Sequence, residues 1–245
     1  MEPSHRGGAN AINCWYDRDI DATMRRTQTR PLPAQRMDPS AALAFGIGLG
    51  VLAGVELALL VNLAAALLAM VGYLFYACVY TMYLKRHTAQ NIVIGGVAGA
   101  IPPLVGWAAV TGGLSMTAFF LFAIVFYWTP PHFWALSLLI RSDYAAADVP
   151  MLPVTAGVGE TRRQILLWTA VLVVVTILPF VGRSFGPIYL GGAVLLGAAF
   201  FALSIRAVTT RTSKAARQVF YYSIWYLAAI FVVMVVDSIV FRGGA

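Results

Sequence analysis

Charged side chains are scarce in this sequence. Asp, Glu, Lys and Arg make up only 11% of its 245 residues, and 60% of the residues are hydrophobic. A soluble domain carries about 25% charged residues, so most of this chain does not meet bulk water. Apolar runs of roughly 20 residues, the length that crosses a bilayer, occur at 39–60, 62–83, 92–111, 115–140, 162–182, 187–205 and 219–241. We therefore predict an all-α integral membrane protein of about seven transmembrane helices, with residues 1–245 forming one membrane-embedded domain.

Cysteine is equally scarce, since Cys14 and Cys78 are the only two in the sequence. This number excludes a disulfide framework and a cysteine-rich zinc site. Cys14 lies beside a charged stretch and Cys78 inside a predicted span, so we do not expect the two to pair. Residues 1–13 contain no apolar core of the kind that a cleaved signal peptide requires.

The basic residues alternate between successive loops. Two of them, Arg183 and Arg242, fall on one side of the predicted bundle. The other fifteen share the opposite side: Arg6, Arg18, Arg25, Arg26, Arg30, Arg36, Lys85, Arg86, Arg141, Arg162, Arg163, Arg206, Arg211, Lys214 and Arg217. The positive-inside rule places this side, and the N-terminus with it, in the cytoplasm of a bacterial inner membrane. For Arg206 to Arg217 we infer orientation alone, and short basic loops at a membrane surface argue against nucleic-acid binding.

The predicted outer loops are very short, whereas the inner loops at 22–38, 84–91, 141–161 and 206–218 are longer. Function tends to lie on loops, so we expect the working face to be cytoplasmic. Two proline pairs, Pro102-Pro103 and Pro130-Pro131, interrupt neighbouring spans. Simple kinks needed for packing would explain them, but two breaks flanking one outer loop also indicate a cavity between the spans.

The stretch "AINCWYDRDIDATM" at 11–24 gathers acidic residues in an apolar chain. On one continuous helix, Asn13, Asp17 and Asp21 would share a stripe, and Asp19 would point nearly the opposite way. Stacked carboxylates repel one another, and a Mg²⁺ ion between them would relieve this, since Mg²⁺ prefers oxygen ligands. The alternative is a mixed-charge helix end resting on lipid headgroups.

A second acidic cluster, "RSDYAAADVPMLP", follows the span that contains Pro130. Asp143 is the better metal-ligand candidate and Asp148 the weaker, because the two share a face only if the helix ends before Pro150. Arg25, Arg26 and Arg30 on the same side suit phosphate oxygens, and "YLKRH" at 83–87 adds a further basic group there. Together these groups predict a site for a metal diphosphate, with a long hydrocarbon in an apolar cavity below it.

Such a site favours ionisation of an allylic diphosphate, because the metal and the arginines neutralise charge on the leaving group. Aromatic faces would stabilise the carbocation, and ordinary packing is the alternative role for each ring. The candidate rings are Tyr76, Tyr127, Trp128, Phe133 and Trp134.

The pattern from Asn13 to Pro31, N-x-x-x-D-R-D-I-D-x-x-M-x-R-T-x-x-R-P, resembles the first aspartate-rich motif of the UbiA-type intramembrane prenyltransferases. More narrowly it resembles the protohaem IX farnesyltransferase (haem O synthase) family. The stretches at 83–112, 127–154 and 221–231 resemble the same family, so the likeness covers nearly the whole chain from Asn13 onward.

The resemblance implies transfer of a farnesyl group from farnesyl diphosphate to a vinyl group of haem b, with addition of water, to give haem O. It implies that Asn13, Asp17 and Asp21 hold Mg²⁺ and diphosphate and that Asp143 serves a second metal cluster. It also implies phosphate contacts for a set of basic residues: Arg25, Arg26, Arg30, Lys85, Arg86 and Arg141. The same likeness makes His132 and His87 candidates for binding haem, where a packed helix histidine and an ordinary loop histidine are the alternatives. Haem A synthase or terminal oxidase assembly proteins would be possible partners.

The family has nine transmembrane helices, and its first aspartate motif follows the second of them. Here that motif begins at Asn13, so we expect the first helix and most of the second to be absent, through a late start codon or a shortened form.

Two other functions compete with this interpretation. Prenylation of another aromatic or chlorophyll-like acceptor would use the same metal site. A transporter would require charged groups at mid-membrane, whereas Glu56 and Asp237, the acidic residues within spans, lie near the outer ends.

Overall fold

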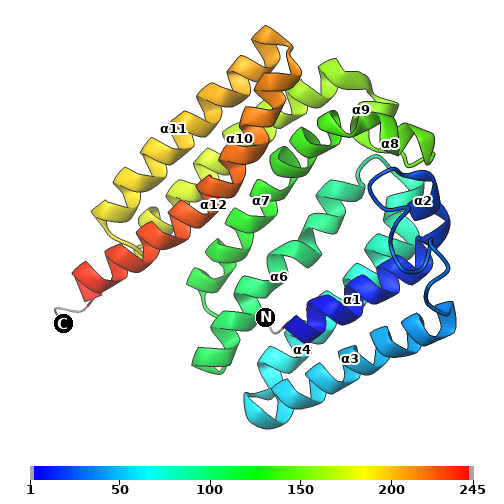
Figure 1. Ribbon diagram of the computed structural model, residues 1–245. Helices are drawn as coiled ribbons and strands as arrows, with labels where there is room; N and C mark the ends of the chain where they lie inside the picture. The colour runs from blue at the N-terminus through cyan, green and yellow to red at the C-terminus, as the bar shows by residue number, and fades with distance from the viewer. Residues whose placement is uncertain (1–2, 243–245) are drawn as a thin grey trace.

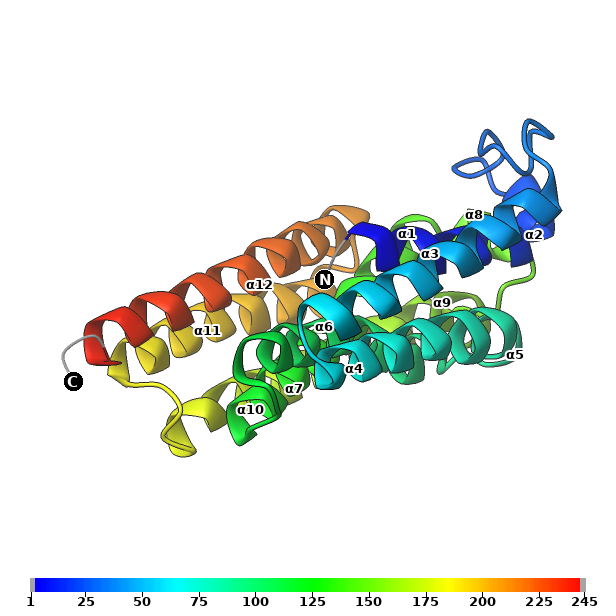
Figure 2. The ribbon, with the colours of Figure 1, turned by 90° about the horizontal axis from the view of Figure 1, so that it is seen from below.

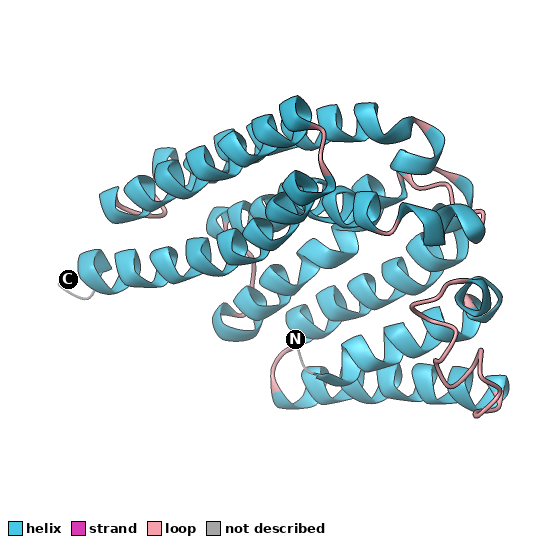
Figure 3. Cartoon of the chain, turned by 45° about the horizontal axis from the view of Figure 1, so that its top comes forward, coloured by secondary structure: helices cyan, strands magenta, loops and turns pink. Residues whose placement is uncertain are grey.

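The computed structural model describes the backbone of residues 3–242 and the side chains of residues 7–241. Every regular element in this part of the chain is helical (Figure 3). The elements are α1 (Pro3–Tyr16), α2 (Arg18–Thr23), α3 (Pro39–Leu60), α4 (Leu63–Leu74), η1 (Phe75–Leu84, a π-helical stretch), α5 (Lys85–His87), α6 (Asn91–Thr111), α7 (Met116–Leu139), α8 (Arg141–Ala146), α9 (Leu152–Thr155), α10 (Gly157–Val181), α11 (Pro187–Thr210) and α12 (Ser213–Arg242).

Seven helices of the described chain are long and apolar enough to cross a membrane, which confirms the predicted number. One of them, Leu63–His87, joins α4, η1 and α5 into a single rod. The fifth and seventh begin at Gly157 and Ser213, several residues before the apolar runs at 162 and 219, because polar residues continue these helices beyond the apolar segment. The protein is an integral membrane protein.

The long helices run roughly parallel, and α2, α5 and α8 gather at the end opposite the C-terminus (Figure 2). Helices α1, α3 and α4 lie on one side of the bundle, and α10, α11 and α12 lie on the other (Figure 1). Between them, α6 packs against α4 and α7, while α7 also contacts α10 and α12. The bundle therefore has α6 and α7 at its centre, and these are the helices that carry the proline pairs.

Helix α1 packs closely along α3 because glycines face one another at the contact. A Cβ on Gly46 would lie 2.8 Å from Ile12 Cγ1 and 3.0 Å from Gly8 O. Gly48, on the other face of α3, has no heavy atom within 4 Å of its Cβ position. The small residues let the two backbones approach, as in other membrane helix pairs, and this contact holds α1 against α3.

Helices α6 and α7 continue through their proline pairs. The largest buried cluster surrounds α7 and includes Trp134, Ile165, Tyr189 and Tyr226. Large apolar side chains such as Val110 are exposed on the outer surface. Such a surface is suited to lipid, whose tails are as apolar as the side chains.

Polar side chains connect the helix ends at the end of the bundle opposite α2, α5 and α8. Asn62 Oδ1 caps α4 by accepting from Ala65 N at 2.9 Å, and its Nδ2 donates to Ala108 O at 2.9 Å. Asp237, which is buried near the end of α12, accepts hydrogen bonds from the N–H groups of Gly186 and Tyr189. Asp237 therefore caps α11 from a different helix, which gives this acidic residue a structural role.

Candidate active site

The helix predicted over 11–24 is interrupted at Asp17. Helix α1 ends at Tyr16, and Asp17 is the N-cap of α2 with φ −89° and ψ 11°. Hydrogen bonds still run from Asp17 N to Asn13 O (2.9 Å) and from Asp21 N to Asp17 O (2.7 Å). The prediction of one continuous helix is therefore wrong. The backbone turns at Asp17, so α2 is a separate helix, although hydrogen bonds still join residues that are four apart on both sides of the turn.

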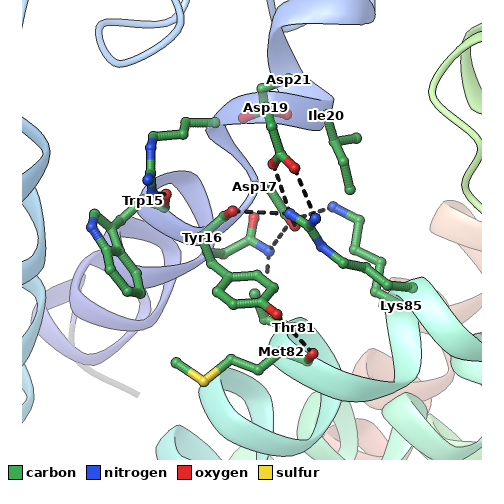
Figure 4. Close-up of polar contacts among 12 residues, drawn as sticks. Trp15, Tyr16, Asp17, Asp19, Ile20, Asp21, Thr81, Met82 and Lys85 are labelled. Carbon is green, nitrogen blue, oxygen red and sulfur yellow. Dashed lines mark hydrogen bonds and ion pairs between the residues drawn. The ribbon is translucent and has the colours of Figure 1, made fainter.

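Asp17 is completely buried and is surrounded by donors. Asn13 Nδ2 donates to its Oδ2 at 2.8 Å, and Lys85 Nζ forms an ion pair with the same oxygen. Arg86 Nη2 lies 3.4 Å from Oδ1. Asn13 also donates to Thr81 Oγ1 at 3.2 Å. Figure 4 shows how this network joins the end of α1 to η1 and α5.

Asp21 and Asp19 each have an arginine partner. Arg30 Nη1 lies 2.7 Å from Asp21 Oδ2. Burial acts to lower the pKa of Arg30, but the hydrogen bond and charge of Asp21 overcome it and raise that pKa. Arg86 donates to both oxygens of the exposed Asp19, at 2.7 and 2.8 Å, and these bonds lower the pKa of Asp19 to about 2.

The carboxylates therefore tolerate one another through the protein's own cations. These cations offset the repulsion that the sequence predicts between Asp17 and Asp21. Each buried acid has its own basic partner, Lys85 in one case and Arg30 in the other. A buried charge without such a partner would be costly.

An apolar cavity of about 420 Å³ lies among α1, α4, η1, α6 and α7. Tyr76 and Tyr80 of η1, whose ring centroids are 5.4 Å apart, form part of its wall. Asn10, one turn before Asn13 on α1, also lines it. The cavity expected from the proline pairs is present, with Pro102 in its wall, and it extends along α1 and η1 toward the charged residues.

Not all of the candidate rings line this cavity. Tyr76, Trp128 and Phe133 do. Tyr127 and Trp134 instead pack against Trp168, with ring centroids 5.7 and 6.1 Å from it. Packing is therefore the role that the structure gives to Tyr127 and Trp134.

The second acidic cluster lies on α8 and the turn after it. The helix ends at Ala146, before Pro150. Asp143 is half-buried and Asp148 is exposed with φ +50°, and neither forms an ion pair with the residues that the structure describes. Burial raises the pKa of Tyr144, Arg26 opposes the increase and Asp143 adds to it. The loop that contains Arg26 therefore faces α8.

The remaining basic candidates, Arg25, Arg26 and Arg141, are exposed at the same end of the molecule. The structure thus brings Lys85, Arg86 and Arg30 into direct contact with the first acidic cluster. Arg25, Arg26 and Arg141 form no ion pair with the described residues.

The donor chemistry of the first cluster suits a hard divalent ion. Asn13, Asp17 and Asp21 provide amide and carboxylate oxygens, the ligands that Mg²⁺ prefers, at the end of the cavity. Within residues 7–241 no three His, Cys, Asp or Glu side chains form a metal-binding group. In this structure the carboxylates form ion pairs with Lys85, Arg86 and Arg30 instead. The oxygen atoms of the cluster are thus of the kind that Mg²⁺ binds, but they are paired with basic side chains.

The two candidate histidines have different surroundings. His87 is exposed, stacks on Tyr83 at 4.8 Å and has its Nδ1 2.6 Å from Tyr83 O. His132 is stacked between Trp128 and Phe220, at centroid distances of 4.2 and 4.9 Å. It lines a groove of about 470 Å³ between α7 and α12.

The hydrogen bonds around His132 fix its tautomer. Ser223 Oγ donates its one proton to Phe220 O at 2.6 Å. At 2.7 Å from His132 Nδ1, the same oxygen must therefore accept. The proton lies on Nδ1, and Nε2 keeps its lone pair.

Several residues of the site were not predicted from the sequence. Thr81 contacts Asn13, Tyr73 and Tyr80 line the cavity, and Ser223 orients His132. The tyrosines of this span give no catalytic signature, since aromatic residues are common in membrane helices. Asn91 was also missed, although a polar residue directly before an apolar run was a possible signal.

Comparison with known proteins agrees with this geometry. The model of the UbiA prenyltransferase family matches residues 4–232. A protoheme IX farnesyltransferase from Rhizorhabdus wittichii is 50% identical over 238 residues, which cover 95% of this chain and 79% of that protein. Another from Roseiflexus sp. is 52% identical over 234 residues, 96% of this chain. The chain spans 44% of the length of this Roseiflexus relative.

Solved structures share the fold at low sequence identity. A structure of digeranylgeranylglyceryl phosphate synthase has a TM-score of 0.76 at 21% identity. The match covers 95% of this chain and 81% of the chain in that structure. A UbiA homologue from Archaeoglobus fulgidus, bound to GPP and Mg²⁺, has a TM-score of 0.68 at 14% identity, covering 94% of this chain and 84% of its own. With its acidic motif, its helical fold and relatives that are half identical, this chain belongs to the UbiA prenyltransferase family, among the members named protoheme IX farnesyltransferase.

Proposed function

We propose that this chain transfers a farnesyl group from farnesyl diphosphate to a vinyl group of haem b, with addition of water and release of diphosphate, and so forms haem O. The observation that carries the proposal is the apolar cavity whose lining residues on α1 and η1, Asn10 and Tyr80, directly precede the buried Asp17 cluster. A prenyl diphosphate has the same division into an apolar chain and a charged head. The half-identical relatives named protoheme IX farnesyltransferase support this choice of donor and acceptor.

The farnesyl chain would occupy the cavity, with its first carbon toward the charged end. Tyr76, Trp128 and Phe133 line the wall of this cavity. Their faces carry negative charge density that attracts a cation, so they would stabilise the allylic cation once the diphosphate departs. The apolar wall would also limit its early capture by bulk water.

The diphosphate would bind at the acidic cluster and the basic residues around it. Asn13, Asp17 and Asp21 would hold Mg²⁺, with Asp143 and Asp148 serving a second ion, and the A. fulgidus homologue bound to GPP and Mg²⁺ supports a metal of this kind. Bound Mg²⁺ would neutralise charge on the leaving group. Lys85, Arg86 and Arg30 would bind phosphate oxygens, with Arg25, Arg26 and Arg141 at the rim.

The haem would lie in the groove that contains His132. The Nε2 lone pair of His132 is free to bind iron because Ser223 holds the proton on Nδ1. Aromatic rings on both sides of the imidazole suit a flat macrocycle. His87 is the weaker candidate, since it is exposed beside the phosphate-binding residues and is better placed for a propionate.

Substitution of Asp17 tests the proposal directly. The chain supplied with haem b, farnesyl diphosphate and Mg²⁺ should form haem O, detected by its mass. Asp17→Asn should lower the rate by about 10²–10³-fold, the size of effect seen when one transition-state contact is removed. Asp38→Asn, which keeps an oxygen at the N-cap of α3, should retain the rate. Full activity of Asp17→Asn, or no haem O from the unaltered chain, would contradict the proposal.

A further inference from the structure

Asn91, the first residue of α6, is a buried amide without a hydrogen-bonding partner. Its side chain is 0% exposed, and neither Nδ2 nor Oδ1 forms a hydrogen bond with the described chain. Its backbone is satisfied, since Asn91 N donates to Thr88 O at 3.2 Å. Buried polar groups are nearly always paired, and an unpaired one is destabilising. This side chain therefore requires an explanation.

The position of Asn91 on α6 relates it to the cavity. Asn91, Gly95, Ala98 and Pro102 follow the 4, 3, 4 spacing that places residues on one face of a helix. Gly95, Ala98 and Pro102 line the cavity, as does Ile92. Asn91 thus continues the cavity-lining stripe by one turn in the direction of α5.

The neighbouring helices change from apolar to charged at the same end. On α1, the cavity-lining Asn10 precedes Asn13 and Asp17. On the rod formed by η1 and α5, the cavity-lining Tyr80 precedes Lys85. Asn91 follows Lys85 by six residues, across the short turn that joins α5 to α6. Its amide therefore belongs to the level at which the apolar cavity meets the charged cluster.

Two other described asparagines, Asn62 and Asn13, have hydrogen-bonding partners within the chain. Asn62 caps α4 and donates to Ala108 O at 2.9 Å. Asn13 donates to Asp17 and Thr81. A purely structural role for Asn91 would predict comparable bonds, and the described chain provides none. Among the described residues with an unpaired buried group, Asn91 is distinguished from Trp134 by its place beside the cavity-lining Ile92 at the end of the cavity-lining stripe.

We propose that Asn91 contacts the substrate at the junction between the prenyl chain and the diphosphate. A diphosphate has only acceptor oxygens, so Asn91 Nδ2 donates to the oxygen nearest the first carbon of the chain. This inference rests on the proposed function and adds a substrate-binding residue outside the acidic motifs. The contact holds the bond that breaks at the boundary between the apolar and the charged regions.

Asn91→Leu provides the test, because leucine has nearly the shape of asparagine and no polar atom. Removing an unpaired buried amide should keep or raise the melting temperature. Affinity for farnesyl thiodiphosphate with Mg²⁺, an unreactive analogue, should fall about tenfold to a hundredfold, as expected for loss of one hydrogen bond to a charged group. Both quantities can be measured on the purified full chain in detergent, by thermal melting and by calorimetry.

Trp134→Phe is the matched control, since Trp134 Nε1 is also buried without a partner but the ring does not line the cavity. This variant should keep the affinity for the analogue. The proposal is overturned if Asn91→Leu binds the analogue as tightly as the unaltered chain, or if it melts well below it, which would reveal a structural role. If the unaltered chain itself fails to bind the analogue, the proposed function is what fails.

Discussion

Ser223 is a single residue that fixes two of the rings around the proposed acceptor groove. Its hydroxyl accepts from His132 Nδ1 at 2.7 Å, and its backbone oxygen accepts from Trp128 Nε1 at 2.7 Å. The first of these bonds determines which nitrogen of the imidazole can act as a ligand. Groups that orient a metal-binding histidine in this way contribute to its affinity without touching the metal.

Ser223→Ala should therefore weaken haem binding without removing it. Loss of the acceptor frees the proton and the ring of His132, and we expect about a tenfold lower affinity for haem b. Titration followed at the Soret band measures this affinity. His132→Ala should lose the histidine-ligated spectrum, and Ser223→Thr, which restores a hydroxyl, should regain most of the affinity. Unchanged spectra in both alanine variants would place the haem elsewhere.

The spacing of Asp17 and Asp21 could be recognised in the sequence because four residues make about one helical turn. The sequence also placed their basic partners, Lys85 and Arg30, on the same side of the membrane, but it did not indicate which base pairs with which acid. Lys85 lies 68 residues after Asp17, and such a contact depends on how separate helices pack. The unpaired amide of Asn91 is a similar case, since an absent partner leaves no pattern in the sequence.

At the level of helices, the contact between α1 and α3 determines the position of the acidic cluster. Gly46 faces Ile12 and Gly8, whereas Gly48 faces no other heavy atom within 4 Å. These two glycines, two residues apart on the same helix, allow a direct comparison of a packed and an open position.

Gly46→Leu should displace α1 and so abolish haem O formation. The Cβ of the new side chain would lie only 2.8 Å from Ile12 Cγ1, which is too close for two carbon atoms. Gly48→Leu should keep the activity, and its melting temperature should stay the same or rise, since Leu favours a helix more than Gly does. Activity and melting of the two purified variants test this. Equal behaviour of both variants would show that close packing of α1 is not required.

Asp237 connects the ends of α11 and α12 through two backbone N–H groups. Asp237→Ala should leave both donors unpaired and reduce the free energy of unfolding by about 2 to 4 kcal/mol. Asp237→Asn, which keeps one acceptor oxygen, should lose less. Thermal melting in detergent measures the change, and the activity of the folded fraction should be preserved. A melting temperature unaffected by Asp237→Ala would contradict this capping role.

The seven spans were predictable because apolar length and loop charge follow directly from the sequence. The break at Asp17 and the π-helical stretch Phe75–Leu84 were not, since neither segment contains the Gly or Pro that marks most interruptions. The capping of α11 by Asp237 also escaped prediction, because 51 residues separate Asp237 from Gly186.

For the molecule as a whole, seven spans place the loop before α3 and the end of α12 on opposite faces of the membrane. We expect Lys214, at the start of α12, in the cytoplasm and the loop at Arg183 outside. Single cysteines introduced at these positions, with Cys14 and Cys78 replaced by serine, can be labelled with an impermeant maleimide in right-side-out vesicles. Only the cysteine at 183 should react. Reaction at 214 alone would invert the orientation.

Trp128 lines both the cavity and the groove that contains His132. One ring thus separates the two proposed substrates, each of which has its own compartment. Donor and acceptor can then be bound simultaneously, as a ternary complex, with neither required to leave before the other enters. Steady-state rates measured at varied concentrations of both should give intersecting double-reciprocal lines, the pattern of a sequential reaction, and parallel lines would mean that the two compartments are never filled together.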